Sequence, residues 1–406
     1  MFQPPRPARR HGRPLLAALA CGALLSCSDG IGPPGPDPDP PVAAALQVAL
    51  RDPHPGVAGY PLPDVVAVRV VDAQGRGVPN AAVHLSVTSG GGSVSPAAAG
   101  TDANGRVTAM WTLGGEGAQT ALARVEGLVP VELRARIVPV PETARPMLGA
   151  LAGHIASTIS RLEQSLPLNP QSASYIQARI DLLRTPGLGG DIVEAGRYAE
   201  GRIAARWGSV PVTAVFPAEN MRAEAFDALR FAESAVPVVE GFLDTPFPTP
   251  SVRIWYGFGI GSSGGGGTLN LEDRGTYETR TPATRLPHDA ITVHELSHSY
   301  VANESLTQFL ELYGYNVLRT GTADVSAWTF TRGWVPGRDA NADVHALLDV
   351  YQMIGPAAMA AAYRAALPLR PAYGQPLSAA VQQVFVDAAP AAVKSQVAAK
   401  IARVSF

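Results

Sequence analysis

Residues 290–311 read AITVHELSHSYVANESLTQFLE, and this stretch carries the strongest chemical pattern in the chain. It contains His294-Glu295-Leu296-Ser297-His298, an H-E-x-x-H motif. Helix positions i and i+4 lie about 40° apart and one turn up, so both imidazoles can reach one metal ion. Apolar residues fall on both sides of this predicted helix, with Asp289 as its N-cap, which indicates a helix buried between layers. Buried histidines need polar partners, and a metal ion supplies them.

A second helix is predicted directly after the motif. Asn303 is a good N-cap, and Gly321 stands where the helix is expected to end. A continuous helix would leave Glu304 about 80° away from His294, so a turn at 301–303 is required. One stripe of the second helix is apolar: Leu306, Phe309, Leu310, Tyr313 and Val317. A separate stripe is polar, and it is either solvated or turned toward the metal: Glu304, Gln308, Glu311 and Tyr315.

The H-E-x-x-H motif followed by Asn-Glu-x-Leu-x-x-Phe-x-Glu resembles the gluzincin metallopeptidases, the clan of thermolysin and the aminopeptidase-N-like enzymes. The resemblance covers about residues 210–400 and implies an α+β zincin-like domain. It further implies one Zn²⁺ per chain, held by His294, His298 and Glu304. Only five residues separate His298 from Glu304, fewer than is usual in gluzincins, so Glu311 stays open as an alternative ligand.

The same resemblance implies a reaction. A zinc-activated water would hydrolyse a peptide bond, with Glu295 as general base. Residues 265–271 resemble the edge strand that binds the substrate backbone, with Gly267, Leu269 and Asn270 as the contact residues. Residues 342–367 resemble the C-terminal helices of the family. The family's oxyanion-stabilising tyrosine has no counterpart near Ala340, and four residues are candidates for that role or for supporting the ligands: Tyr313, Tyr315, His345 and Gln308.

An all-β module is predicted for residues 44–139. Short runs with a period of two recur at intervals typical of a sandwich: 66–71, 82–87, 107–113, 121–125 and 131–138. Asp102–Gly105 is predicted to be a hairpin turn, with positive φ at Asn104 and Gly105. These segments resemble the immunoglobulin-like repeat of bacterial invasin and intimin, which implies a spacer or adhesive domain without catalysis.

Residues 140–210 are predicted to form a helical connector, with helices over 147–165 and 172–184. The metallopeptidase-like domain is expected to span 211–406. It opens with strands at 212–216 and 251–257 and a helix over 221–236 that Pro237 ends or kinks.

The first residues indicate export. Arginines precede an apolar run at 15–25, which is too short to span a bilayer stably. Leu24-Leu25-Ser26-Cys27 resembles a bacterial lipobox, which implies a signal peptide over 1–26 and a lipid on Cys27. A Pro/Gly-rich tether follows over 27–43. We therefore expect an extracytoplasmic lipoprotein held at the outer membrane or the cell surface.

Composition narrows the remaining classes. Hydrophobic residues make up 46% and charged residues 16%, which excludes a wholly disordered chain. The formal net charge of −2 gives no electrostatic case for a nucleic-acid partner. Cys21 and Cys27 are the only cysteines, so a metal in the folded part must be held by His, Asp or Glu.

Three functions remain open at this stage. The leading hypothesis is a lipid-anchored zinc metallopeptidase acting on a peptide or protein substrate. The alternative is a surface adhesion or scaffold lipoprotein whose zincin-like domain is catalytically inactive. A third is a zinc site that binds peptides without turnover.

Overall fold

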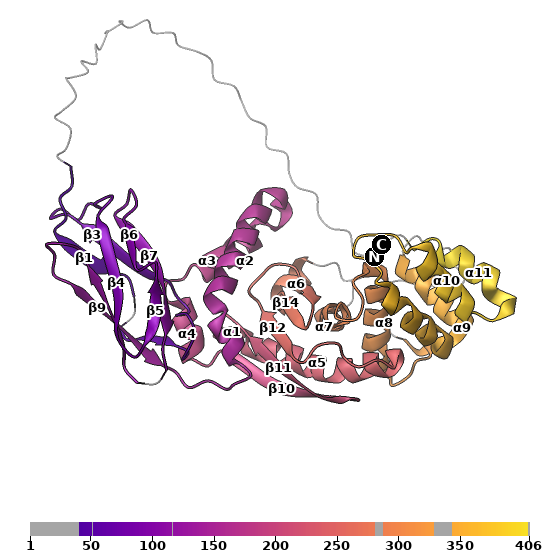
Figure 1. Ribbon diagram of the computed structural model, residues 1–406. Helices are drawn as coiled ribbons and strands as arrows, with labels where there is room; N and C mark the ends of the chain where they lie inside the picture. The colour runs from indigo at the N-terminus through magenta and orange to yellow at the C-terminus, as the bar shows by residue number, and fades with distance from the viewer. Residues whose placement is uncertain (1–39, 51, 116, 281–286, 329–342, 405–406) are drawn as a thin grey trace, which may run out of the picture. The chain divides into compact units, whose positions relative to one another are not determined.

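A computed structural model describes residues 40–404 of the chain, apart from 51, 116, 281–286 and 329–342 (Figure 1). The predicted signal peptide, Cys27 and most of the tether lie outside the described residues. Pro41–Phe406 forms one compact unit. No helix among the described residues combines the length and the apolar character needed to cross a membrane.

The first folded part is a β-rich module of two sheets. One sheet has the order β1 (Ala45–Val48), β3 (Val66–Val71), β7 (Arg106–Leu113), β5 (Gly92–Ser95). The other has the order β2 (His54–Gly56), β9 (Val131–Ile137), β8 (Gln119–Arg124), β4 (Ala82–Ser89), β6 (Ala98–Gly100). Alternate side chains from both sheets share one apolar core around Trp111, which is fully buried. The predicted strands are therefore confirmed.

The turn at Asp102–Gly105 is present, but it does not close a hairpin. β6 and β7, which flank it, belong to different sheets. Only Gly105 has positive φ (73°), because the Asp102 carboxylate accepts the N–H groups of Asn104 and Arg106 and shapes the turn instead. Both parts of the prediction for this turn were wrong.

Helices follow the β-rich module, as predicted for the connector. They are α1 (Arg145–Gly149), α2 (Leu151–Ser165), α3 (Ala173–Leu183) and α4 (Leu188–Glu194). The expected boundary at 210/211 falls inside a strand, however, because β11 spans Gly208–Val215 and pairs with β10 (Tyr198–Ala205). The next sheet thus begins at Tyr198, in a segment whose Gly and Ala content hides the strand pattern.

This third sheet is mixed, with the order β10-β11-β12-β14-β13. β11, β12 (Val252–Tyr256) and β14 (Thr268–Leu271) run parallel, and the outer strands β10 and β13 (Ser263–Gly265) pair antiparallel. Helix α5 (Arg222–Leu243) links β11 to β12 and packs against the sheet (Figure 1). Pro237 lies inside α5 and does not end it, since buried side chains on both sides of the proline hold the helix in place.

The strand expected at the sheet edge is in fact internal. β14 carries Leu269 and Asn270 and pairs on both sides, with β12 and with β13. Gly266 and Gly267 have φ of 55° and 73°, so the glycine run turns the chain tightly and adds β13 outside β14. The edge strand is therefore Ser263–Gly265, and the expectation for Gly267, Leu269 and Asn270 is corrected.

Six helices complete the described fold: α6 (Arg274–Arg280), α7 (His288–Ser297), α8 (Glu304–Thr320), α9 (Asp343–Ala366), α10 (Ala379–Ala388) and α11 (Lys394–Ile401). α9 is interrupted at Gly355, which has a non-helical φ of 78° and directly precedes Pro356. Helices α5 and α7 to α11 share a large apolar core with the mixed sheet. This core fixes α7 and α8, which carry the predicted site.

Candidate metal centre

Helix α7 carries His294 to Ser297 of the H-E-x-x-H motif in a buried position, and the half-buried His298 follows directly as its C-cap. It begins at His288 after Pro287, so Asp289 is not its N-cap as expected. Asp289 instead lies in the first turn, where a negative charge is favourable, and pairs with Arg274 (3.1 Å). His294, Glu295 and Leu296 are all buried against the core.

Helix α8 presents the downstream carboxylates. Helix α7 ends at Ser297 and α8 begins at Glu304, so the chain turns between the two helices, as predicted. Asn303 caps α8 through its side-chain oxygen, which accepts the Leu306 N–H (3.2 Å). Gly321 ends the helix with φ of 71°. Both capping predictions are confirmed.

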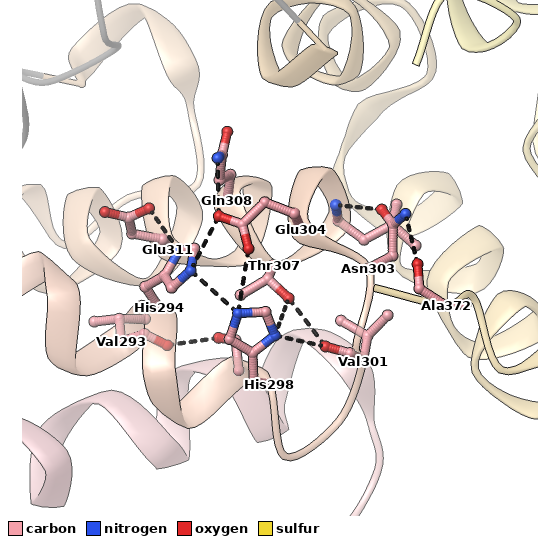
Figure 2. Close-up of polar contacts among 12 residues, drawn as sticks. Val293, His294, His298, Val301, Asn303, Glu304, Thr307, Gln308, Glu311 and Ala372 are labelled. Carbon is pink, nitrogen blue, oxygen red and sulfur yellow. Dashed lines mark hydrogen bonds and ion pairs between the residues drawn. The ribbon is translucent and has the colours of Figure 1, made fainter. Parts of the chain in front are cut away.

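The two imidazoles and one carboxylate converge (Figure 2). The Nε2 atoms of His294 and His298 lie 3.2 Å apart. The Glu304 carboxylate reaches both rings, with Oε1 3.3 Å from His294 Nε2 and Oε2 3.4 Å from His298 Nε2. Three potential donors from two helices therefore face one point.

The opposite ring nitrogens have partners of their own. His294 Nδ1 donates to Glu311 Oε2 (3.1 Å), and the Glu311 side chain is fully buried. His298 Nδ1 lies 3.3 Å from the Val301 carbonyl and 3.2 Å from the Thr307 hydroxyl, which itself donates to Val301 (3.0 Å). Such contacts select the tautomer that leaves Nε2 free to bind a metal. Glu311 thus contacts His294 on the side away from Glu304.

Glu295 completes the cluster. Its carboxylate and one nitrogen of each histidine lie within 4.8 Å of one another. Either Glu295 or Glu304 could therefore approach a cation by proximity alone. Glu304 is the better third donor, because it contacts both Nε2 atoms and is held by the Gln308 amide (3.1 Å).

Burial and hydrogen bonding shift the pKa values of Glu295, His294 and Glu304 away from their usual ranges, and not all in the same direction. Burial raises the pKa of Glu295 to about 7. Burial lowers the pKa of His294, but its hydrogen bonds with Glu304 and Glu311 outweigh burial and raise this pKa to about 10. Hydrogen bonds with His294 and His298 hold the pKa of Glu304 well below its usual range.

A cavity of about 500 Å³ opens onto the cluster. It is bounded by the edge strand β13 on one side and by α7 and the start of α8 on the other. Its lining residues are Ser262, Ser263, Gly264, Gly265, His294, Glu295, His298, Ala302, Glu304 and Tyr373. A second cavity of about 240 Å³ shares the lining residues Ser262 and Ser263 with it.

Sequence reasoning missed Tyr373. This residue lies in the turn before α10, far along the chain, and its ring centroid is 6.2 Å from that of His298. Its side chain is 69% exposed. The only signal was an aromatic residue inside the Pro- and Gly-rich stretch RPAYGQP, which does not indicate where that turn folds back.

Three predicted candidates lie elsewhere. Tyr313 packs in an aromatic cluster, with its ring centroid 4.3 Å from that of Phe242. Tyr315 packs against Phe231 (6.1 Å between centroids), and His345 lies half-buried on α9. None of these three is among the residues that line the cavity.

Gly264 brings the edge strand into direct contact with α7. A Cβ atom at Gly264 would lie 2.4 Å from the Glu295 carbonyl oxygen and 2.7 Å from the Glu295 Cβ. Only glycine permits this approach, so the backbone that carries Glu295 is held against β13.

The sequence matches no protein-family model and no curated protein. Solved structures similar to part of it include domains 4–9 of the surface-layer protein SbsC, with 16% identity over 25% of this chain and 15% of that one (TM-score 0.21). The D0–D1 domain of intimin is 22% identical over 23% of this chain and 48% of that one (TM-score 0.18). A β-glucuronidase from Parabacteroides merdae is 20% identical over 23% of this chain and 12% of that one (TM-score 0.20). Each match spans less than half of the solved structure, and similarity at this level assigns neither fold nor function.

Proposed function

We propose that this protein is a zinc metallopeptidase that hydrolyses peptide bonds. The observation that carries the proposal is the convergence of His294 Nε2, His298 Nε2 and the Glu304 carboxylate from two adjacent helices. Two imidazoles and one carboxylate are a donor set that zinc prefers in catalytic sites, which keep one position open. The contacts from Glu311 and Val301 to the other ring nitrogens fit the same ion.

Zinc held by His294, His298 and Glu304 would activate water and polarise the carbonyl of the bond to be cleaved. Glu295 accepts one proton from the attacking water as the new C–O bond forms. It then donates that proton to the nitrogen of the leaving amine as the C–N bond breaks. A pKa near 7 suits a group that must both take up and release a proton at neutral pH.

The substrate is proposed to lie along β13. Ser263, Gly264 and Gly265 line the cavity, and β13 is the last strand of its sheet, so its outer backbone edge can pair with an extended peptide. No atom lies within 4 Å of a Cβ built at Gly265, which leaves room beside this residue for a substrate chain.

The remaining assignments rest on the same proposal. Two sheets around one core support an immunoglobulin-like spacer ahead of the enzyme. A mixed sheet followed by the motif helix supports a zincin-like, gluzincin-related domain. The lipobox at Cys27 supports an extracytoplasmic lipoprotein anchored by its lipid.

The test uses the purified full chain with zinc. We expect about one equivalent of zinc by elemental analysis and hydrolysis of a quenched fluorescent peptide library. Glu295→Gln should keep the zinc and lose roughly 10²- to 10⁴-fold in turnover. Glu126→Gln, on the surface of the β-rich module, is the matched control and should leave both unchanged.

Two results would contradict the proposal in different ways. Full turnover by Glu295→Gln would remove Glu295 as the general base. Zinc binding without hydrolysis of any library peptide would favour the inactive scaffold, or a zinc site that only binds peptides.

A further inference from the structure

Asn303 makes two structural connections with one side chain. It is fully buried and directly precedes Glu304. Its Oδ1 accepts the Leu306 N–H, and its Nδ2 donates to the Ala372 carbonyl (3.3 Å) (Figure 2). The same Nδ2 also donates to the Gln375 carbonyl (3.0 Å). The acceptor end caps α8, and the donor end holds a segment almost seventy residues later in the chain.

The segment that Asn303 holds carries Tyr373. Residues 372–376 are all exposed, between the buried side chains of Pro371 and Leu377. Burial in the core therefore holds this segment at its two ends, and between them the Tyr373 ring contacts that of His298. Among the described residues, the two bonds from Asn303 are the hydrogen bonds that reach 372–376. Asn303 thus bonds to the backbone on both sides of Tyr373.

The cap of α8 and the bonds to the 372–376 segment together explain why residue 303 is an asparagine. Asparagine, aspartate and serine cap helices about equally well. Of the three, only asparagine offers an acceptor for the helix and an N–H₂ group with two donors for the segment. An aspartate would direct a carboxylate oxygen at two carbonyl oxygens.

We propose that Asn303 is a positioning residue that ties the Glu304 end of α8 to the turn carrying Tyr373, so that both reach one cavity. The inference goes beyond the proposed peptidase activity but uses the same cavity. It requires that loss of the donor end moves Tyr373 while leaving the zinc ligands in place.

The first experiment is independent of the protein's own turnover. In the Glu295→Gln background, Asn303→Ser and Asn303→Asp keep the capping oxygen and lose the N–H₂ group that bonds Ala372 and Gln375. We expect chymotrypsin to cleave after Tyr373 about fivefold faster or more than in the parent, because two hydrogen bonds are lost. Asn169→Ser is the matched control, since Asn169 Nδ2 also donates to a carbonyl, that of Ser165 (2.9 Å).

The second experiment links the segment to function. In the zinc-loaded enzyme, Tyr373→Phe and Asn303→Ser should each lower kcat/KM, by roughly 10- to 100-fold if the phenol binds the reacting carbonyl. The double variant should be no worse than Tyr373→Phe alone, because both changes remove the same contribution. Zinc content should be unchanged in all three.

The outcomes separate this inference from the proposed function. Unchanged cleavage after Tyr373 in both Asn303 variants overturns it, and so do fully additive losses in kcat/KM. If the wild type hydrolyses no peptide, the peptidase proposal fails while the cleavage rates still decide whether Asn303 holds the turn. If the Asp variant does not fold, the neutral Ser variant carries the test.

Discussion

At the scale of single residues, the partners of the two Nδ1 atoms orient the imidazoles of His294 and His298. Glu311 holds Nδ1 of His294, and the Val301 carbonyl and Thr307 hydroxyl hold Nδ1 of His298. The sequence placed Glu304 and Glu311 on one helix stripe but could not choose between them. The choice depends on how the turn at 298–303 rotates α8 about its axis, and no local residue pattern determines that angle.

Proton release should accompany metal binding. His294 in the metal-free protein keeps its proton up to a pH of about 10, because its raised pKa reflects hydrogen bonds with two carboxylates. A metal needs the neutral imidazole, so at pH 8.5 zinc should displace about one proton from this site. Glu295, with a pKa near 7, is already ionised at that pH and does not add to the count.

Calorimetry in buffers of different ionisation enthalpy measures this number directly. The apparent affinity for zinc should also rise with pH as far as about pH 10, since protons compete less. An affinity that is flat between pH 7 and 10, with no proton released, would contradict the hydrogen bonding assigned to His294. His298→Ala, which lacks one donor, should show greatly weakened binding at every pH.

At the scale of elements, the decisive contact is between the edge strand and the motif helix. The sequence predicted α7 and α8 well, because capping residues and apolar stripes are local signals. It did not predict that β13 is the edge, since that depends on positive φ at Gly266 and Gly267. It missed β10, where Gly201 has no side chain and so allows Leu229 and Glu233 of α5 to lie close to the strand.

Gly264→Ala tests the contact between β13 and α7. The added Cβ would lie 2.4 Å from the backbone of Glu295, so strand and helix must move apart. We expect a loss of about 1–3 kcal/mol in the free energy of unfolding. A drop in kcat/KM should accompany it, because Glu295 shifts relative to the cavity.

The matched control is Gly153→Ala in α2. No atom lies within 4 Å of a Cβ at Gly153, and alanine favours a helix, so stability should rise by up to about 1 kcal/mol. Thermal and urea unfolding measure both changes. Equal stability of Gly264→Ala and the wild type would mean that β13 and α7 are not in tight contact.

At the scale of the whole folded unit, the Asp64 carboxylate is one of the groups that join the β-rich module to the connector. Asp64 accepts the N–H groups of Gly189 (3.1 Å) and Gly190 (2.7 Å) at the start of α4, and it pairs with the buried His54 (2.9 Å). A Cβ at Gly189 would collide with the Pro63 carbonyl at 2.4 Å. The sequence predicted two modules and a helical connector, but contacts between residues this far apart in the chain have no local pattern.

Asp64→Ala should weaken this junction by about 1–3 kcal/mol, because two backbone donors lose their acceptor. Calorimetric unfolding should then show the β-rich module melting before the rest. Burial opposes ionisation of Asp64, but hydrogen bonds from His54 and Gly190 outweigh it and lower the pKa. The contribution is therefore present above the ordinary aspartate pKa and is lost as the pH falls through the lowered value.

Asp102→Ala is the control for this prediction. Asp102 also accepts two backbone N–H groups, but within a turn of the β-rich module, so its loss should not separate the two transitions. A single transition in Asp64→Ala, at the wild-type temperature, would contradict the role of Asp64 at the junction.

The three proposed donors to the ion lie within one short stretch, from His294 to Glu304, while Tyr373 comes much later. A ribosome making this protein would deliver every donor before it reaches the phenol. A product cut short between α8 and the RPAYGQP turn would contain every donor but lack α10 and α11, which share the apolar core that holds α7 and α8 in place. Capture of the ion therefore depends on chain made long after the donors themselves.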